Sequence, residues 1–203
     1  MIHVAHLSGS LTLAVLLTGC SPTCGEGENT SIDLDANGVA DCAETLVKNS
    51  QFVGGIQPNA AGPEAQIALD SADAQGFAGS ASMKVTNTAS TNVPTIRAGR
   101  QCIRLIPEQR YVIAGQFYIT PGHAINGLGA QIEVRLFSEP SCAGGEGSAQ
   151  VTDIVMTEGS WQSVKDEITS PRANSAYFEA SVRKSANQPG ASILFDNLLI
   201  HQL

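Results

Sequence analysis

The residues best suited to chemistry in this sequence form one short acidic stretch, "SIDLDANGVADCAETL", at residues 31–46. Oxygen-bearing side chains and one glycine follow the spacing D-x-D-x-N-G-x-x-x-x-x-E there. Carboxylate, amide and backbone oxygens at this spacing can surround one hard cation, and an oxygen-only shell favours Ca²⁺ over Zn²⁺ or copper. The pattern predicts a calcium site whose ligands are Asp33, Asp35, Asn37, the backbone carbonyl of Val39, Asp41 and Glu44.

The acidic stretch resembles a single EF-hand loop, with Gly38 at the sharp turn. A full EF-hand is not expected, because Gly, Asn, Thr and Ser in the preceding "CGEGENTSI" disfavour an incoming helix. A lone loop that contains Cys42 is more similar to the calcium loops of dockerins and thrombospondin type-3 repeats, which implies a structural ion. The alternative is a solvated acidic turn in a linker. We expect the loop and one or two following helical turns at residues 32–48.

The N-terminus, "MIHVAHLSGSLTLAVLLTGC", contains an apolar run at residues 11–17 that is too short to span a bilayer. It is typical of the apolar region of a signal peptide, although the preceding residues lack Lys and Arg. The closing "LTGC" resembles the lipobox of bacterial lipoproteins. This resemblance implies a signal peptide at 1–19, an acyl anchor on Cys20, a tether at 20–31 and a place at the outer membrane or cell surface. An ordinary secretory signal with a free Cys20 thiol is the alternative.

The four remaining cysteines are an even number in an exported chain, which predicts two disulfides. Three pairings are possible. We favour Cys24–Cys42 with Cys102–Cys142, because each bridge then stays within one local unit.

Composition limits the classes of protein that fit. The chain has 203 residues and 42% hydrophobic content, enough for one main core. Its net charge of -8 argues against a nucleic-acid partner, because little basic surface is available to neutralise phosphates.

From residue 49 onward, short alternating runs are separated by clusters of Gly, Pro, Asn and Ser. At least seven such runs predict one all-β domain at residues 49–203, an antiparallel β-sandwich or jelly roll. Alternation within each run predicts which side chains face the core, for example Ile132, Val134 and Leu136. The best runs are 82–88, 100–106, 110–120, 130–138, 161–169, 176–184 and 192–203.

Several motifs occur in a recognisable order in these runs: "SMKV", "P-x-x-x-Y" at 107–111, "G-x-W" at 159–161 and "FDN" at 195–197. In this order they resemble carbohydrate-binding modules with a galactose-binding-like jelly-roll fold. The resemblance implies a non-catalytic sandwich that binds glycans across a sheet face. It also implies that a structural calcium sometimes lies near Asp196, although Val53 stands where the family often has an acidic residue.

A glycan site needs aromatic platforms and hydrogen-bonding groups on an outward sheet face. The alternation predicts Gln116, Tyr118, Glu133, Arg135, Tyr177, Glu179 and Arg183 as this ligand-binding set, with Phe137 as a further platform. The alternative for the same residues is a ladder of Glu and Arg pairs on an ordinary wetted face. For Trp161 we favour a packed structural role over a sugar platform.

Enzyme signatures such as G-x-S-x-G, H-E-x-x-H and the P-loop do not occur. The leading hypothesis is therefore a cell-surface lipoprotein that binds a polysaccharide or other glycan without catalysis. It would be attached to a membrane through its lipid and would hold structural Ca²⁺. The alternative is a structural or adhesion lipoprotein whose jelly roll contacts proteins. A small glycosidase with a carboxylate pair is a third hypothesis, and no oligomeric state is predicted.

Overall fold

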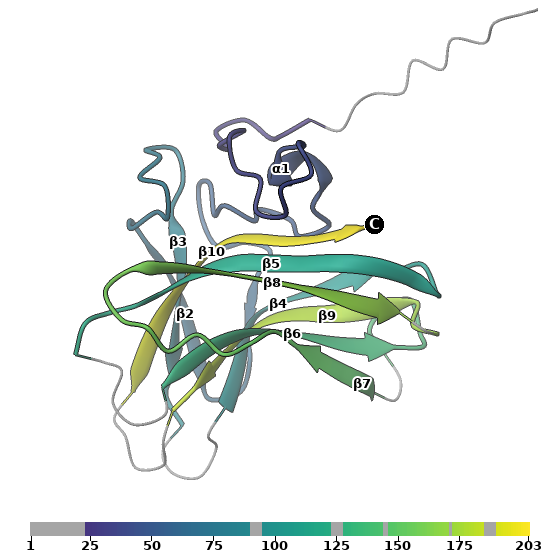
Figure 1. Cartoon of the computed structure of the whole chain (residues 1–203). Helices are drawn as coiled ribbons and strands as arrows, with labels where there is room; N and C mark the ends of the chain where they lie inside the picture. The colour runs from purple at the N-terminus through teal and green to yellow at the C-terminus, as the bar shows by residue number, and fades with distance from the viewer. Residues whose placement is uncertain (1–22, 90–94, 123–127, 144–145, 171, 185–189) are drawn as a thin grey trace, which may run out of the picture.

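Two antiparallel sheets face each other in the computed structural model (Figure 1), which describes residues 23–89, 95–122, 128–143, 146–170, 172–184 and 190–203. The predicted signal peptide and Cys20 lie outside the described residues. Among the described segments, no helix combines the length and apolar character that crossing a membrane would need. The predicted all-β sandwich is confirmed.

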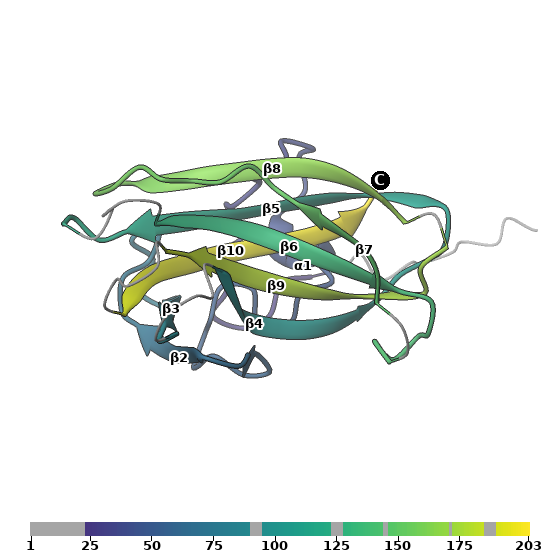
Figure 2. The ribbon, with the colours of Figure 1, turned by 90° about the horizontal axis from the view of Figure 1, so that it is seen from below.

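Each sheet has five strands. The first, here called the β9 sheet, has the order β1-β4-β9-β6-β7; Figure 2 shows β9 between β4 and β6. Its strands are β1 (Ala60–Ala61), β4 (Thr95–Arg104), β9 (Ser175–Arg183), β6 (Gly129–Phe137) and β7 (Glu146–Val151). The second, the β10 sheet, has the order β2-β3-β10-β5-β8. Its strands are β2 (Ala65–Asp70), β3 (Ser82–Asn87), β10 (Ala191–Gln202), β5 (Gln109–Ile119) and β8 (Trp161–Ser170).

All seven predicted runs are strands, and their predicted inward faces form the core. Ile132, Val134 and Leu136 of β6 are buried together with Phe178 of β9. Three strands were not predicted, and all three lie at sheet edges: β1, β2 and β7. An edge strand carries few buried side chains, so its alternation is weak in the sequence. β4 also begins earlier than predicted, at Thr95.

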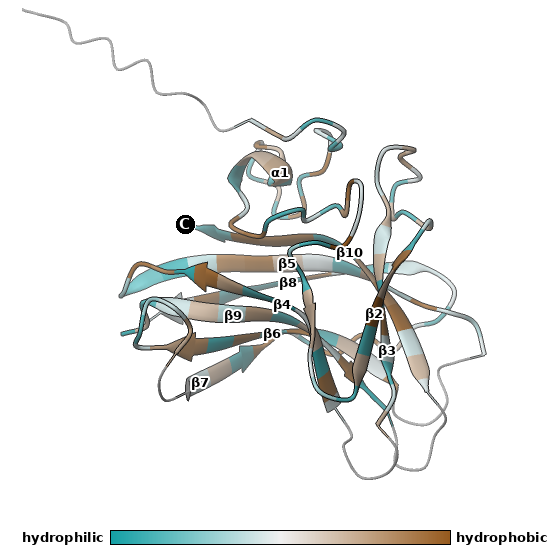
Figure 3. Cartoon of the chain, turned by 180° about the vertical axis from the view of Figure 1, so that it is seen from behind, coloured by the Kyte–Doolittle hydropathy of each residue, from teal (hydrophilic) through white to brown (hydrophobic). Residues whose placement is uncertain are grey.

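The N-terminal segment with the short helix α1 (Asp41–Glu44) lies against the outer face of the β10 sheet (Figure 1). Leu34 packs against Val112, Ala114 and Leu199, which point outward from β5 and β10 yet are buried beneath this segment. The hydropathy colouring in Figure 3 shows brown, apolar stretches along these two strands. Leu46 also donates its backbone N–H to the Ile200 carbonyl at 2.8 Å. The acidic loop is therefore docked on the sandwich.

Both predicted disulfides are confirmed. Cys24–Cys42 closes the N-terminal segment, and Cys102–Cys142 joins β4 to the loop after β6. The second bridge holds that loop over one end of the β9 sheet, where Cys142 N donates to Ser175 Oγ at 3.0 Å.

Candidate functional site

The outer face of the β9 sheet carries a band of charged side chains around one tyrosine, Tyr177. We call this surface the arginine face. Alternation on three neighbouring strands places its members outward, because residues in register across an antiparallel pair point to the same side. The arginine face consists of Arg97, Arg100, Arg104, Glu133, Arg135, Tyr177, Glu179 and Arg183.

A β-bulge in β4 brings two arginines to this face that strict alternation would separate. The pairing of β4 with β9 shifts between Ala98 and Gln101, and Gly99 in between has a φ of 64°. Glycine adopts this left-handed conformation without strain, and a bulge adds one residue to a strand. Arg97 and Arg100 therefore both reach outward-facing glutamates.

Ion pairs cross the arginine face from strand to strand. Arg100 Nε lies 2.6 Å from Glu179 Oε1, and Arg135 Nε lies 2.5 Å from the other oxygen of the same carboxylate. Arg97 Nε lies 2.8 Å from Glu133 Oε2, which raises the pKa of the Arg97 guanidinium above its ordinary value. Both carboxylates are buried although they point away from the core. The ladder of Glu and Arg pairs that the sequence offered as an alternative is therefore present.

Tyr177 lies half-buried in the middle of this ladder. The Cζ atoms of Arg100 and Arg135 lie 4.8 and 5.3 Å from its ring centroid. The Phe137 ring packs edge-on against it at 5.2 Å. Phe137 is only 5% exposed, so Tyr177 is the ring of this pair that keeps a partly exposed surface.

Two shallow hollows lie on either side of Arg100. One, of about 220 Å³, is lined by Pro63, Glu64, Thr95, Ile96, Arg97 and Arg100. The other, of about 210 Å³, is lined by Leu46, Lys48, Pro58, Arg100, Gln101 and Cys102. Arg100 therefore contributes to the lining of two depressions next to the arginine face.

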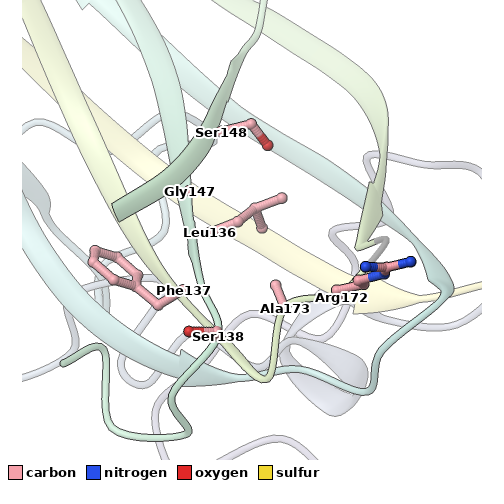
Figure 4. Close-up of a pocket in the computed structure, with 7 residues that line it drawn as sticks. All are labelled: Leu136, Phe137, Ser138, Gly147, Ser148, Arg172 and Ala173. Atoms are coloured by element: carbon pink, nitrogen blue, oxygen red, sulfur yellow. The ribbon is translucent and has the colours of Figure 1, made fainter. Parts of the chain in front are cut away.

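A third hollow, of about 220 Å³, lies where the end of β6 meets β7 and the β8–β9 connection. Figure 4 shows the Leu136 side chain between Ser148 and Ala173. The Phe137 ring lies at the left of this view and Arg172 at the right. Of the predicted ligand-binding residues, the lining of this hollow contains only the further platform, Phe137, which is 5% exposed. We therefore do not place the site there.

The seven predicted ligand-binding residues do not form one surface. Glu133, Arg135, Tyr177, Glu179 and Arg183 belong to β6 and β9. Gln116 and Tyr118 belong to β5, in the opposite sheet of the sandwich. Alternation predicts which side chains point outward but not to which of the two sheets a strand belongs. For this reason the sequence prediction placed residues of β5 on the same surface as residues of β6 and β9.

On the β10 sheet, Tyr118 contacts Trp161 with ring centroids 5.6 Å apart, and both rings are partly exposed. The nearby Gln116 Oε1 accepts hydrogen bonds from Gln75 Nε2 at 2.6 Å and Asn197 Nδ2 at 2.7 Å. Because other side chains already engage its amide oxygen, Gln116 is poorly placed to bind a ligand.

Asp196 is fully buried beneath the segment that contains Ala74 and Gln75. Its carboxylate accepts the N–H groups of Ala74 at 2.9 Å and Asn197 at 2.8 Å. Burial, reinforced by the neighbouring Asp73 carboxylate, raises the pKa of Asp196 to about 8. Two carboxylates in a desolvated place suit either a shared proton or a cation.

Hydrogen bonds among its own side chains and backbone organise the acidic loop. Asp33 accepts the N–H of Gly38 at 2.9 Å on one oxygen and that of Asn37 at 3.1 Å on the other. The Gly38 bond is the main reason that the pKa of Asp33 is lowered. Asn37 Nδ2 lies 3.0 Å from both oxygens of Glu44, so the fifth and twelfth positions of the pattern are in contact.

Asp41 and Val39, two further predicted ligands of the loop, differ in their exposure to solvent. The Asp41 carboxylate is buried and accepts the Leu34 N–H at 3.1 Å, and burial raises its pKa to about 6. One carboxylate oxygen each from Asp33, Asp35 and Asp41 nevertheless lie within 4.8 Å of one another. Val39 is exposed. The donor set fits a hard cation such as Ca²⁺ because its oxygens converge in one place.

His201, on the outward side of β10, was not among the predicted site residues. Its Nε2 lies 2.6 Å from Asp35 Oδ2, and its Nδ1 lies 3.6 Å from Glu44 Oε2. Lys165 of β8 donates to the backbone carbonyl of Asp35 at 2.7 Å. His201 is 166 residues from Asp35 in the chain, so no local sequence pattern could have joined the two.

Comparisons with known proteins agree on the fold. No family model and no curated protein sequence matches the chain. The C-terminal family 22 carbohydrate-binding module of Clostridium thermocellum Xyn10B matches 75% of this chain and 91% of that chain, with a TM-score of 0.54 and 12% identity. A family 22 xylan-binding domain matches 79% and 96%, with a TM-score of 0.53 and 13% identity.

Two other similar structures are parts of much larger proteins. Tailspike protein 4 of bacteriophage CBA120 has a TM-score of 0.56 and 12% identity over 79% of this chain. The match to the Xyn10B fragment with its first family 22 module and catalytic module has a TM-score of 0.52 and 15% identity over 78% of this chain. This chain spans only 22% and 28% of those two structures. The class that these likenesses define is a β-sandwich of the carbohydrate-binding-module type.

Proposed function

We propose that this protein is a non-catalytic glycan-binding module and that the arginine face is its binding surface. The main support for this proposal is the position of Tyr177. Its partly exposed aromatic ring lies at the centre of a sheet face and is held in place by contacts with Arg100, Arg135 and Phe137. A sugar ring can pack its apolar face on such an aromatic ring while its hydroxyls bond to polar neighbours.

The likeness to complete carbohydrate-binding modules supports this proposal at the level of fold. The enzymes among the similar structures match this chain over only a small part of their length, so they lend little support to catalysis. We further propose, from the lipobox-like "LTGC" at residues 17–20, that a lipid on Cys20 holds the module at the outer membrane or cell surface.

The second candidate is an adhesion or structural lipoprotein whose sandwich contacts proteins. The ion-pair ladder favours it, because Glu133 and Glu179 already bond to arginines and offer few free acceptors to sugar hydroxyls. The two candidates differ in whether Tyr177 contributes to binding of a purified polysaccharide.

We also propose that the acidic loop holds a structural Ca²⁺. Asp33, Asp35, Asn37 and Glu44 would supply most of its oxygens, with Asp41 and the Val39 carbonyl completing the shell. A bound cation would offset the repulsion among these carboxylates and fix the loop against the β10 sheet. We also propose a second cation site, at the neighbouring carboxylates of Asp196 and Asp73.

Affinity electrophoresis of the mature chain through gels that contain xylan, galactan, glucan or pectin tests the glycan proposal. We expect one polysaccharide to retard the protein and Tyr177→Ala to abolish most of this retardation. Tyr118→Ala is the matched control, because it removes a partly exposed tyrosine from the opposite sheet and should change nothing. Absence of retardation by every polysaccharide would favour the adhesion candidate, and retardation that depends on Tyr118 would move the site to the β10 sheet.

A further inference from the structure

The arginine face is cationic on a protein that is otherwise strongly acidic. Five of the seven arginines in the chain lie on it, against two glutamates, whereas the whole chain carries a net charge of -8. Five arginines against two glutamates give this face an excess of positive charge, whereas the rest of the chain, which holds the other six basic residues, is strongly acidic. A surface of this kind attracts an anionic ligand and orients it.

The hydrogen-bonding capacity left on this face consists mainly of donors. Both oxygens of Glu179 accept from arginine, and one Glu133 oxygen accepts from Arg97 Nε and from Ser181 Oγ at 3.1 Å. Arg97 and Arg100 use Nε for these pairs, so the pairs leave the four terminal N–H groups of each guanidinium available as donors. A neutral sugar needs acceptors as well as donors, whereas a carboxylate needs donors alone.

Two further arginines extend this donor set beyond the ladder. Arg104 and Arg183 are exposed, and within the described part of the chain neither forms an ion pair. Arg104 lies at the end of β4 beside Ser175, and Arg183 lies at the far end of β9. In the strand register Arg104 lies two positions from Tyr177 on one side, and Arg97 and Arg183 lie four and six positions from it on the other, so the arginines form a row along the face. Glu64 contributes a carboxylate to the hollow beside Arg97 and Arg100.

From this arrangement we propose that the glycan recognised by the arginine face is acidic, with uronate carboxylates paired to Arg97, Arg100, Arg104 and Arg183 while a sugar ring packs on Tyr177. The inference rests on the proposed function and adds the substrate class. A guanidinium binds a planar carboxylate with two parallel hydrogen bonds, and such charge-assisted pairs are stronger than bonds to neutral hydroxyls.

The test measures binding of the mature chain to oligogalacturonate by isothermal titration calorimetry at 50 and 300 mM NaCl. Two ligands serve for comparison. One is the fully methyl-esterified form of the same oligosaccharide, which has the same backbone but no charge, and the other is a neutral xylo-oligosaccharide. We expect the acidic ligand to bind at least about tenfold more tightly than its ester and to weaken at high salt.

Two variants locate the effect. Arg104→Gln with Arg183→Gln removes two charges that are not part of the described ladder, so the fold is retained, and should weaken binding of the acidic ligand by about tenfold or more. Arg110→Gln is the matched control, since it removes an exposed arginine of β5 in the opposite sheet, and it should bind as the wild type does.

The outcomes separate the inference from the proposed function. Equal affinity for the acid and its ester, or binding of neutral xylo-oligosaccharide alone, would overturn the acidic-ligand inference and leave glycan binding intact. Absence of binding to all three ligands would overturn the acidic-ligand inference, whereas the proposed function falls only if every polysaccharide in the affinity electrophoresis also fails to retard the protein. Equal binding of single-stranded DNA, or equal loss in Arg110→Gln, would show non-specific polyanion attraction and overturn the inference.

Discussion

Arg100 Nε lies 2.6 Å from Glu179 Oε1, on a sheet face where that carboxylate has no exposed surface. Arg135 contacts the second oxygen of the same group. Glu179 therefore positions both guanidinium groups that flank the Tyr177 ring. The ladder and the proposed glycan platform are one structure, in which buried ion pairs hold an aromatic ring in place.

The first prediction concerns the stability of this ladder. Glu179→Gln leaves Arg100 and Arg135 without their shared buried counter-charge, so the free energy of unfolding should fall by about 3 kcal/mol. Urea denaturation followed by circular dichroism measures this change. Glu167→Gln is the matched control, because Glu167 pairs with Arg110 in an exposed position and the change should cost at most about 1 kcal/mol. Equal effects of the two substitutions would show that the ladder is only a wetted surface.

The second prediction concerns calcium. Calorimetric titration of the calcium-free mature chain should give one binding isotherm that Asp33→Ala abolishes, because Asp33 contributes the first oxygen of the loop and binds the Gly38 turn. Asp166→Ala removes an exposed carboxylate from β8 and should leave the isotherm unchanged. An isotherm that survives Asp33→Ala would place the ion elsewhere, and Asp196→Asn would then show whether the second carboxylate pair holds it.

The third prediction concerns pH. Burial raises the pKa of Asp196 to about 8, above the ordinary value of 3.8 for an aspartate. The folded state thus favours the protonated carboxyl, so this stabilisation is complete below about pH 3.8 and is lost as pH rises toward 8. In EDTA, Asp196→Asn should make the free energy of unfolding less dependent on pH between 5 and 8. Asp153→Asn, at an exposed position, should keep the wild-type slope; an equal slope in Asp196→Asn would refute the assignment.

The fourth prediction concerns docking of the acidic loop. His201→Ala removes the contact with Asp35 at 2.6 Å, so amide hydrogen exchange at residues 33–44 should accelerate by about tenfold. Gln202→Ala alters the exposed neighbouring residue of β10 and should have no such effect. Unchanged exchange in His201→Ala would mean that Leu34 and the backbone bond from Leu46 to Ile200 suffice to hold the loop.

The sequence predicted the central strands well because their buried faces alternate, as with Ile132, Val134 and Leu136. It missed β1, β2 and β7 because edge strands bury few side chains. Local spacing also sufficed to bring Asp33, Asn37 and Glu44 together. It could not place His201 beside Asp35, nor separate Tyr118 from Tyr177, because those relationships depend on how distant strands are arranged in space.

The β4 bulge shows a second limit of sequence reasoning. Strict alternation separates Arg97 from Arg100, and only the register shift at Gly99 places both on one face. Local glycine content could have suggested a bulge. It could not have shown that the result is a cationic surface around Tyr177, because the glutamate partners come from β6 and β9.

The most direct test of the central claim is a backbone amide NMR titration of the mature chain with the polysaccharide fragment that binds best. If the arginine face binds the glycan, chemical-shift changes will be concentrated in β4, β6 and β9 around Tyr177, and β5 and β8 near Tyr118 and Trp161 will be unaffected. Changes confined to Tyr118 and Trp161, or no changes with any fragment, would contradict this claim.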